Sequence, residues 1–164
     1  MITKYQYNEF LKFVTQEITS DWVIIGGSLL ALLNAKSRST TDIDICPLDE
    51  MTNENRLLLM NLAIKSGLPV ESINPSADFF LRQIPNWKNS LILFKTGIKG
   101  NIYRPSLELY FKLKLSRASD SDIQDCVSFL EWHKENFLEI NVGTIQNLLK
   151  KYDSKKVQII FEAL

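Results

Sequence analysis

The sequence predicts an α/β (α+β) domain in which a mixed, partly antiparallel sheet is flanked by helices and followed by a helical C-terminal portion. Residues Trp22 to Ile25 form an apolar run that ends at two glycines and a helical pattern, which is typical of a buried strand turning into a helix. Thr41 to Cys46 alternate polar and apolar side chains, which indicates a second strand. From Ser106 onward the apolar residues recur at helical spacing.

The other expected elements follow from the same periodicities. Phe10, Val14 and Ile18 lie one helical turn apart and define the first helix. A hairpin is expected across the Gly97–Gly100 turn. Ser28 has a suitable side chain to cap the helix that follows the glycines. We expect helices at residues 5–19, 29–35, 54–66, 77–84, 106–117, 120–136, 142–151 and 155–163, and strands at 22–25, 41–46, 91–95 and 101–104.

Length and composition limit the number of domains and the classes of partner. The chain has 164 residues, so we expect one domain with a core at residues 20–105 and a helical portion at 106–164. Lysine plus arginine equals aspartate plus glutamate at 19 each. This balance argues against a general nucleic-acid coat protein, which would carry a basic surplus, but it leaves a local basic groove open.

The cysteines and the apolar runs indicate a compartment. Cys46 and Cys126 lie far apart in apolar stretches, as buried thiols of a reducing compartment do. The N-terminus lacks the apolar core of a signal peptide, and no apolar run approaches the length of a membrane span. We therefore expect a cytoplasmic protein without a membrane partner.

A glycine turn is the first candidate element of a site. Gly26, Gly27 and Ser28 follow the first strand and open a helix. Glycines let a backbone approach a phosphate closely, and N–H groups at a helix start point toward it. Alone, this motif is weak, because many α/β proteins use paired glycines only to turn a strand into a helix.

An Asp-x-Asp motif is the second candidate element. Alternate side chains of a strand share a face, so Asp42 and Asp44 point one way while Ile43 and Ile45 point into the core. Two adjacent carboxylates repel each other unless a cation lies between them, and oxygen ligands at this spacing suit Mg²⁺. A strand end that exposes two solvated aspartates is the alternative.

Together the two elements resemble the signature of the nucleotidyltransferase superfamily, which has the DNA polymerase β-like fold. Arg38 and Thr41 ahead of the Asp-x-Asp motif are similar to a bacterial branch of uncharacterised nucleotidyltransferase-like proteins and AbiEii-type toxins. The resemblance implies that the Gly-Ser turn holds the triphosphate of an NTP and that Asp42 and Asp44 hold Mg²⁺, with two ions in the superfamily pattern.

A later Lys-Leu-x-Arg and Asp-x-x-Asp pattern agrees with that branch. Lys114 and Arg117 share one helix face, and Asp122 and Asp125 lie one turn apart on the next helix. The resemblance implies a role for Lys114 at the nucleotide, with Lys112 as its rival. For the other three residues, salt bridges between packed helices remain the alternative, with Asp120 or Asp122 as a helix N-cap.

The superfamily pattern also includes a third carboxylate, on a later strand, as general base. Neither strand of the expected hairpin carries an acid, which leaves Glu71, Asp78 and Glu108 as candidates. His133, the only histidine, is expected at the surface or half-buried.

The expected function is Mg²⁺-dependent transfer of NMP from an NTP to a hydroxyl of a tRNA, a protein or a small molecule. A toxin-type enzyme with a cognate antitoxin is one form of it. A degenerate, non-catalytic module that binds a nucleotide or a partner protein is the alternative. The residues expected at the site are Gly26, Gly27, Ser28, Arg38, Thr41, Asp42, Asp44, Lys114, Arg117, Asp122 and Asp125.

Overall fold

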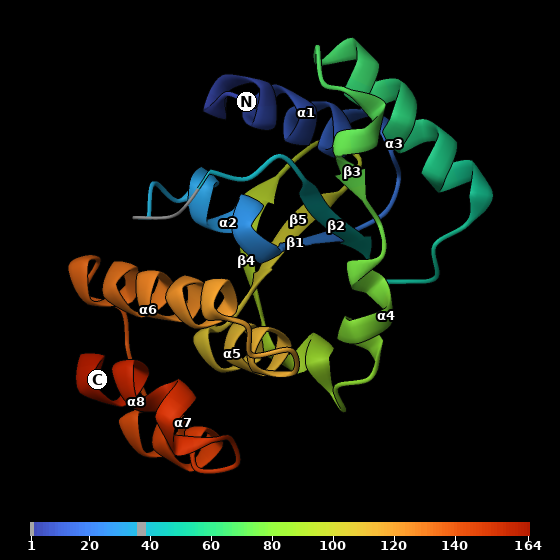
Figure 1. Ribbon diagram of the computed structural model, residues 1–164. Helices are drawn as coiled ribbons and strands as arrows, with labels where there is room; N and C mark the ends of the chain where they lie inside the picture. The colour runs from blue at the N-terminus through green and yellow to red at the C-terminus, as the bar shows by residue number, and fades with distance from the viewer. Residues whose placement is uncertain (1, 36–38) are drawn as a thin grey trace.

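The structure is a computed structural model that describes residues 2–35 and 39–164 (Figure 1). Its strands are β1 (Trp22–Ile25), β2 (Ile43–Pro47), β3 (Ile73–Asn74), β4 (Leu91–Thr96) and β5 (Asn101–Pro105). Its α-helices are α1 (Lys4–Glu17), α2 (Gly26–Leu32), α3 (Asn53–Lys65), α4 (Ala77–Arg82), α5 (Leu107–Leu115), α6 (Asp120–Glu135), α7 (Val142–Leu149) and α8 (Ser154–Ala163). Two short 3₁₀ helices are η1 (Val70–Ser72) and η2 (Trp87–Ser90).

The five strands form one mixed sheet in the order β3-β2-β1-β5-β4. β1 is parallel to β5 and antiparallel to β2, while β3 is parallel to β2 and β4 is antiparallel to β5. The mixed sheet, the flanking helices and the helical C-terminal part confirm the predicted fold class. In Figure 1, α7 and α8 lie farther from the sheet than α5 and α6 do.

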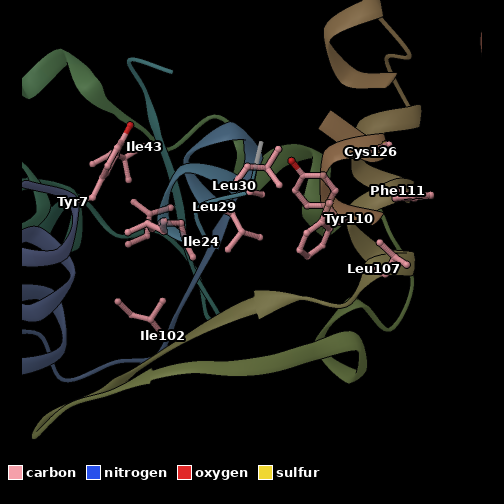
Figure 2. Packing of buried hydrophobic residues seen from close by; sticks show 14 of the residues in the cluster. Tyr7, Ile24, Leu29, Leu30, Ile43, Ile102, Leu107, Tyr110, Phe111 and Cys126 are labelled. Atoms are coloured by element: carbon pink, nitrogen blue, oxygen red, sulfur yellow. The ribbon is translucent and has the colours of Figure 1, made fainter. Parts of the chain in front are cut away.

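Alternation along the strands separates two apolar clusters, one on each face of the sheet. Ile24 and Ile43 belong to the larger cluster, which also takes in side chains of α1, α2 and α6. Val23 and Cys46 belong to the smaller one, together with side chains of α4 and η2. Figure 2 shows Tyr110 projecting from α5 toward α2 in the larger cluster.

The expected helices and strands are found with small shifts at their ends, except at two places. α2 begins at Gly26, before the predicted start at residue 29. β3 was not predicted, because two residues are too few to show alternation. The cysteines are free and buried, as their apolar surroundings predicted. Within residues 2–35 and 39–164, the helices lack the combination of length and apolarity that crossing a bilayer requires.

Candidate functional site

The glycine turn joins β1 to α2 and lies against Asp44 of β2. Gly26 has a φ of +70°, in the left-handed region, and a Cβ at this position would lie 1.8 Å from the Asp44 oxygen Oδ2. Gly27 differs, because a Cβ there would meet Thr40 at an ordinary 3.6 Å. The Tyr110 hydroxyl of α5 donates a hydrogen bond of 3.1 Å to the Gly26 carbonyl oxygen. The turn therefore requires glycine at residue 26, where backbone and carboxylate meet.

The prediction that Ser28 caps α2 is wrong. The helix begins at Gly26, and the residue before it, Ile25, makes no side-chain cap hydrogen bond. Ser28 is buried, and its hydroxyl donates to the Ile25 carbonyl oxygen at 3.0 Å. The same hydroxyl accepts a hydrogen bond of 3.3 Å from the Asp44 backbone N–H. Ser28 thus ties α2 to β2 beside the carboxylate.

The two acids of the Asp-x-Asp motif differ in environment. Asp44 lies on β2, half-buried, while the neighbouring Ile43 points into the larger core. The Asn74 side-chain amide donates a hydrogen bond of 2.7 Å to Asp44 Oδ1. Asp42 lies just before β2 begins and is exposed, and the Thr41 hydroxyl donates to its Oδ1 at 3.3 Å. Only Asp44 is therefore held by the sheet itself.

The charges of the two acids are coupled. Burial raises the pKa of the Asp44 carboxyl, and it outweighs the amide hydrogen bond and the positive charges of Lys114 and Arg117, which lower that pKa. The negative charge of Asp42 also raises the pKa of Asp44. Burial first, and then the charges of Asp42 and Asp44, raise the pKa of Tyr7 on α1 to about 12. Asp44 thus carries a negative charge that its surroundings compensate incompletely.

Two cations follow on α5 and just after it, each paired with acids of α6. Lys114 is 8% exposed, and its Nζ lies 2.7 Å from Asp125 Oδ2 and 3.4 Å from Asp122 Oδ1. The Arg117 guanidinium makes two hydrogen bonds of 2.7 Å to the Asp122 carboxylate, with its side chain 69% exposed. The predicted meeting of a Lys-Arg face with an Asp face is present in the structure.

Asp122 is the centre of this polar cluster. The N-cap of α6 is Ser119, not Asp120 or Asp122, and Asp122 completes a capping box with it. Burial alone would raise the pKa of Asp122. Hydrogen bonds from Arg117 and Ser119, together with the charge of Lys114, hold that pKa far below its usual range. Asp122 is therefore an anion at neutral pH that pairs with both neighbouring cations.

These groups meet at an open cavity of about 300 Å³ between the glycine turn, β2, β3, α4 and the end of α5. Its lining combines polar and charged residues with apolar ones. A volume of this size is typical of a small-ligand site. Its lining consists of Ile25, Gly26, Asp44, Asn74, Ser76, Ala77, Phe80, Leu113, Lys114, Ser116, Arg117 and Asp122.

The cavity gathers part of the expected set of residues. Gly26, Asp44, Lys114, Arg117 and Asp122 line it. The rival lysine, Lys112, instead pairs with Glu108 at 2.8 Å away from this cavity. Arg38 lies outside the described residues. The expected residues that are described but do not line the cavity are Gly27, Ser28, Thr41, Asp42 and Asp125.

None of the candidate third carboxylates lies at this cavity. Glu71 is exposed on η1. Asp78 forms an ion pair with Arg82 at 2.9 Å, and Glu108 forms one with Lys112 of the same helix. The position beside Asp44 is taken by Asn74, which is its partner in the β2–β3 register. In the part of the chain that the structure describes, no three or more acidic, histidine or cysteine side chains are grouped so that they could hold a metal ion.

Asn74, Phe80 and Tyr110 are among the residues of the site that were missed from the sequence. Asn74 lies on the two-residue strand β3, where no alternation marks it. Phe80 on α4 is 53% exposed and lines the cavity. Tyr110 reaches the turn from 84 residues away. No pattern in the sequence marks these three residues.

The comparisons with known proteins agree with this geometry. A family model described as "Nucleotidyltransferase of unknown function (DUF6036)" matches residues 6–159. Neither the curated proteins nor the solved structures gave a match. The family match covers most of the chain, including all the elements that form the cavity. The chain therefore belongs to this family of nucleotidyltransferases of unknown function.

Proposed function

We propose that the protein transfers a nucleotidyl group from a nucleoside triphosphate to a hydroxyl acceptor, with Mg²⁺ as its cofactor. The observation that supports this most is that residues from separate segments of the chain meet at one cavity. Asp44, the glycine turn at Gly26 and the pair Lys114 and Arg117 come from three separate segments and line one cavity. A carboxylate, a close backbone approach and two cations are what a metal-bound triphosphate requires.

Two carboxylates would supply the protein ligands of one Mg²⁺ ion. Asp44 is a half-buried carboxylate whose charge is incompletely compensated, and Asp42 is near enough to act on its pKa. Magnesium takes oxygen ligands and usually completes its shell with water and phosphate oxygens, so two protein carboxylates suffice. We assign Asp42 and Asp44 as the ligands. A second ion would need further oxygens from the substrates.

The remaining residues divide between the phosphates and the base. Lys114 and Arg117 would contact phosphate oxygens, while Gly26 would let the backbone approach them. Phe80 and Leu113 are apolar residues of the cavity lining and would pack against the base. Ser28 would act indirectly, by holding the Asp44 backbone.

The reaction follows from this placement. The acceptor oxygen forms a bond to the α-phosphorus, the bond from that phosphorus to its bridging oxygen breaks, and pyrophosphate leaves. The hydroxyl proton passes to solvent. Bound Mg²⁺ supplies charge neutralisation on the phosphates. Lys114 and Arg117 stabilise the negative charge that grows on the leaving pyrophosphate.

A second candidate is a non-catalytic module that binds a nucleotide without turning it over. Asn74 favours it, because an amide stands beside Asp44 where an acid would serve as general base. Calorimetry with ATP and Mg²⁺, followed by an activity screen, separates the two candidates. Binding without turnover under all acceptors supports the module.

The transfer reaction is tested by incubating the protein with labelled NTPs, Mg²⁺ and candidate acceptors (tRNA, protein and small alcohols) while pyrophosphate is measured. We expect D42A/D44A to abolish product, because the ion then has no protein carboxylate. The matched control E131A/E135A removes two exposed charges from α6 and should keep the wild-type rate. Equal product from wild type and D42A/D44A would reject the assignment.

A toxin-type enzyme is one form of this proposal, and growth arrest on expression, relieved by a neighbouring antitoxin gene, would identify it. We also propose a cytoplasmic location, which the two buried free thiols support.

A further inference from the structure

A second cavity, of about 440 Å³, lies at the other end of α5 from the first. It is bounded by the β4–β5 hairpin, the first turn of α5, the last turns of α6 and the start of α7. α5 has nine residues, so its two ends, and with them the two cavities, are separated by about 13 Å of helix. No residue lines both cavities.

Arg104 of β5 is the group that gives this cavity its chemistry. Its side chain lines the cavity, and the residue is 8% exposed. Within the described ranges no carboxylate lies at ion-pair distance from it. Its guanidinium donates a hydrogen bond of 3.1 Å to the Pro105 carbonyl oxygen and lies 5.4 Å from the centre of the Trp132 ring. Burial lowers its pKa. A buried cation without a counter-ion is costly, so an anion entering the cavity would recover that cost.

Two helix N-termini lie at the cavity and add positive potential. Ser106, the N-cap of α5, and Asn141, the N-cap of α7, both line it. His133, expected near the surface, is instead buried at 3% exposure with Nδ1 2.8 Å from the Phe129 carbonyl oxygen. Burial, and then the charge of Arg104, lowers the pKa of His133, so it does not add a second cation at neutral pH.

Two acids also line the cavity, and neither neutralises Arg104. Glu108 pairs with Lys112 at 2.8 Å, one turn further along α5. Glu139 is exposed to solvent in the loop before α7. Arg104 is therefore a cation of the cavity lining that forms no ion pair with any described carboxylate.

Apart from Thr144, the rest of the lining is apolar. Ile92, Leu107, Leu138 and Ile145 form walls around the polar groups. A fully hydrated inorganic ion would leave these side chains without a partner, whereas a short hydrocarbon body would bury them. The cavity volume lies within the usual range for sites that enclose small organic ligands.

We propose that this cavity binds a small organic anion, with an apolar body against the Ile92 and Ile145 walls and a carboxylate or phosphate group on Arg104. This second site lies apart from the proposed nucleotide site and is independent of whether that site is catalytic.

The test is calorimetric titration of the whole chain with octanoate and, separately, with octyl phosphate, using 1-octanol as the uncharged probe. We expect at least one anion to bind at least tenfold more tightly than the alcohol, and the stronger anion identifies the head group. Arg104→Met should weaken that anion at least tenfold, because the side chain keeps its bulk and loses its charge. The control Arg56→Met removes an exposed cation of α3 and should bind normally.

A second variant protects the test against a folding failure. Thr144→Trp fills the cavity from a half-exposed position on α7, and it should also lose the anion while keeping its helical circular dichroism. The proposal is overturned if neither anion binds folded wild type more tightly than the alcohol. It is equally overturned if a folded Arg104→Met or Thr144→Trp variant binds as wild type does.

Discussion

The two ends of α5 differ in how positive charge is paired. At the C-terminal end, the buried Lys114 and the exposed Arg117 meet Asp122 and Asp125 of α6 in a hydrogen-bonded network. At the N-terminal end, Arg104 is as buried as Lys114 and forms no ion pair with a carboxylate of the described chain. At the C-terminal end the cations are held in place without a ligand. At the N-terminal end the charge of Arg104 has no described counter-ion, and a bound anion would supply one.

The largest expected effect comes from breaking the network at Asp122. D122N should lower the free energy of unfolding by about 3 kcal/mol at pH 7, because Lys114 then loses a buried partner. The effect should depend on pH. The pKa of Asp122 is lowered in the folded state, so its stabilisation is complete above the unfolded pKa of about 4 and is lost as pH falls through the folded value. Urea denaturation from pH 7 to pH 2 measures it.

The wild-type and D122N curves should converge at acid pH. Asp120, which is exposed in the first turn of α6, provides the matched control, and D120N should change stability little. A constant difference between wild type and D122N across the whole pH range would contradict the role assigned to Asp122.

The next effect concerns the glycine turn. G26A should cost about 2 kcal/mol, because alanine is strained at a φ of +70° and its Cβ would displace the Asp44 carboxylate. The variant should also weaken ATP–Mg²⁺ binding in calorimetry. G27A is the control: its Cβ meets only Thr40 at 3.6 Å, and an alanine inside α2 should not destabilise the helix. Similar losses in the two variants would show that the geometry at Gly26 is not special.

The smallest effect has the opposite sign. Arg104→Met should raise the free energy of unfolding by about 1 kcal/mol, because an uncompensated buried charge is replaced by an apolar chain of similar length. Lys114→Met, at a lysine equally buried, should instead destabilise, because it breaks two ion pairs. Thermal unfolding of both variants measures the two changes in stability. If both variants were destabilised, the distinction between the two ends of α5 would be wrong.

Much of the fold could be predicted because its elements are long or sharply patterned. The alternation at Ile43, Asp44 and Ile45 correctly placed the isoleucines in the core and the carboxylate on the other face. The paired glycines correctly marked the turn, although in the structure they form the start of α2 and do not precede it. The family resemblance led to Lys114 and Arg117, which line the same cavity as Asp44.

What could not be predicted depends on contacts between distant segments. Asn74 is beside Asp44 only because β3 pairs with β2 over two residues. His133 is buried where the end of α6 meets β5, α5 and α7 at the second cavity, and helical spacing alone did not distinguish that face. The absence of an ion pair between Arg104 and any described carboxylate is likewise a property of the assembled fold.

The hydrogen bond from Tyr110 to Gly26 has a consequence for synthesis of the protein. The turn near residue 26 leaves the ribosome long before the side chain that anchors it, and Asp122, which orders both cations, follows later still. A nascent chain that ends before α6 has the glycines, the Asp-x-Asp motif and both cations, but it lacks Asp122, which pairs with those cations. The nucleotide binding that we propose should therefore reach full strength only after translation has passed α6.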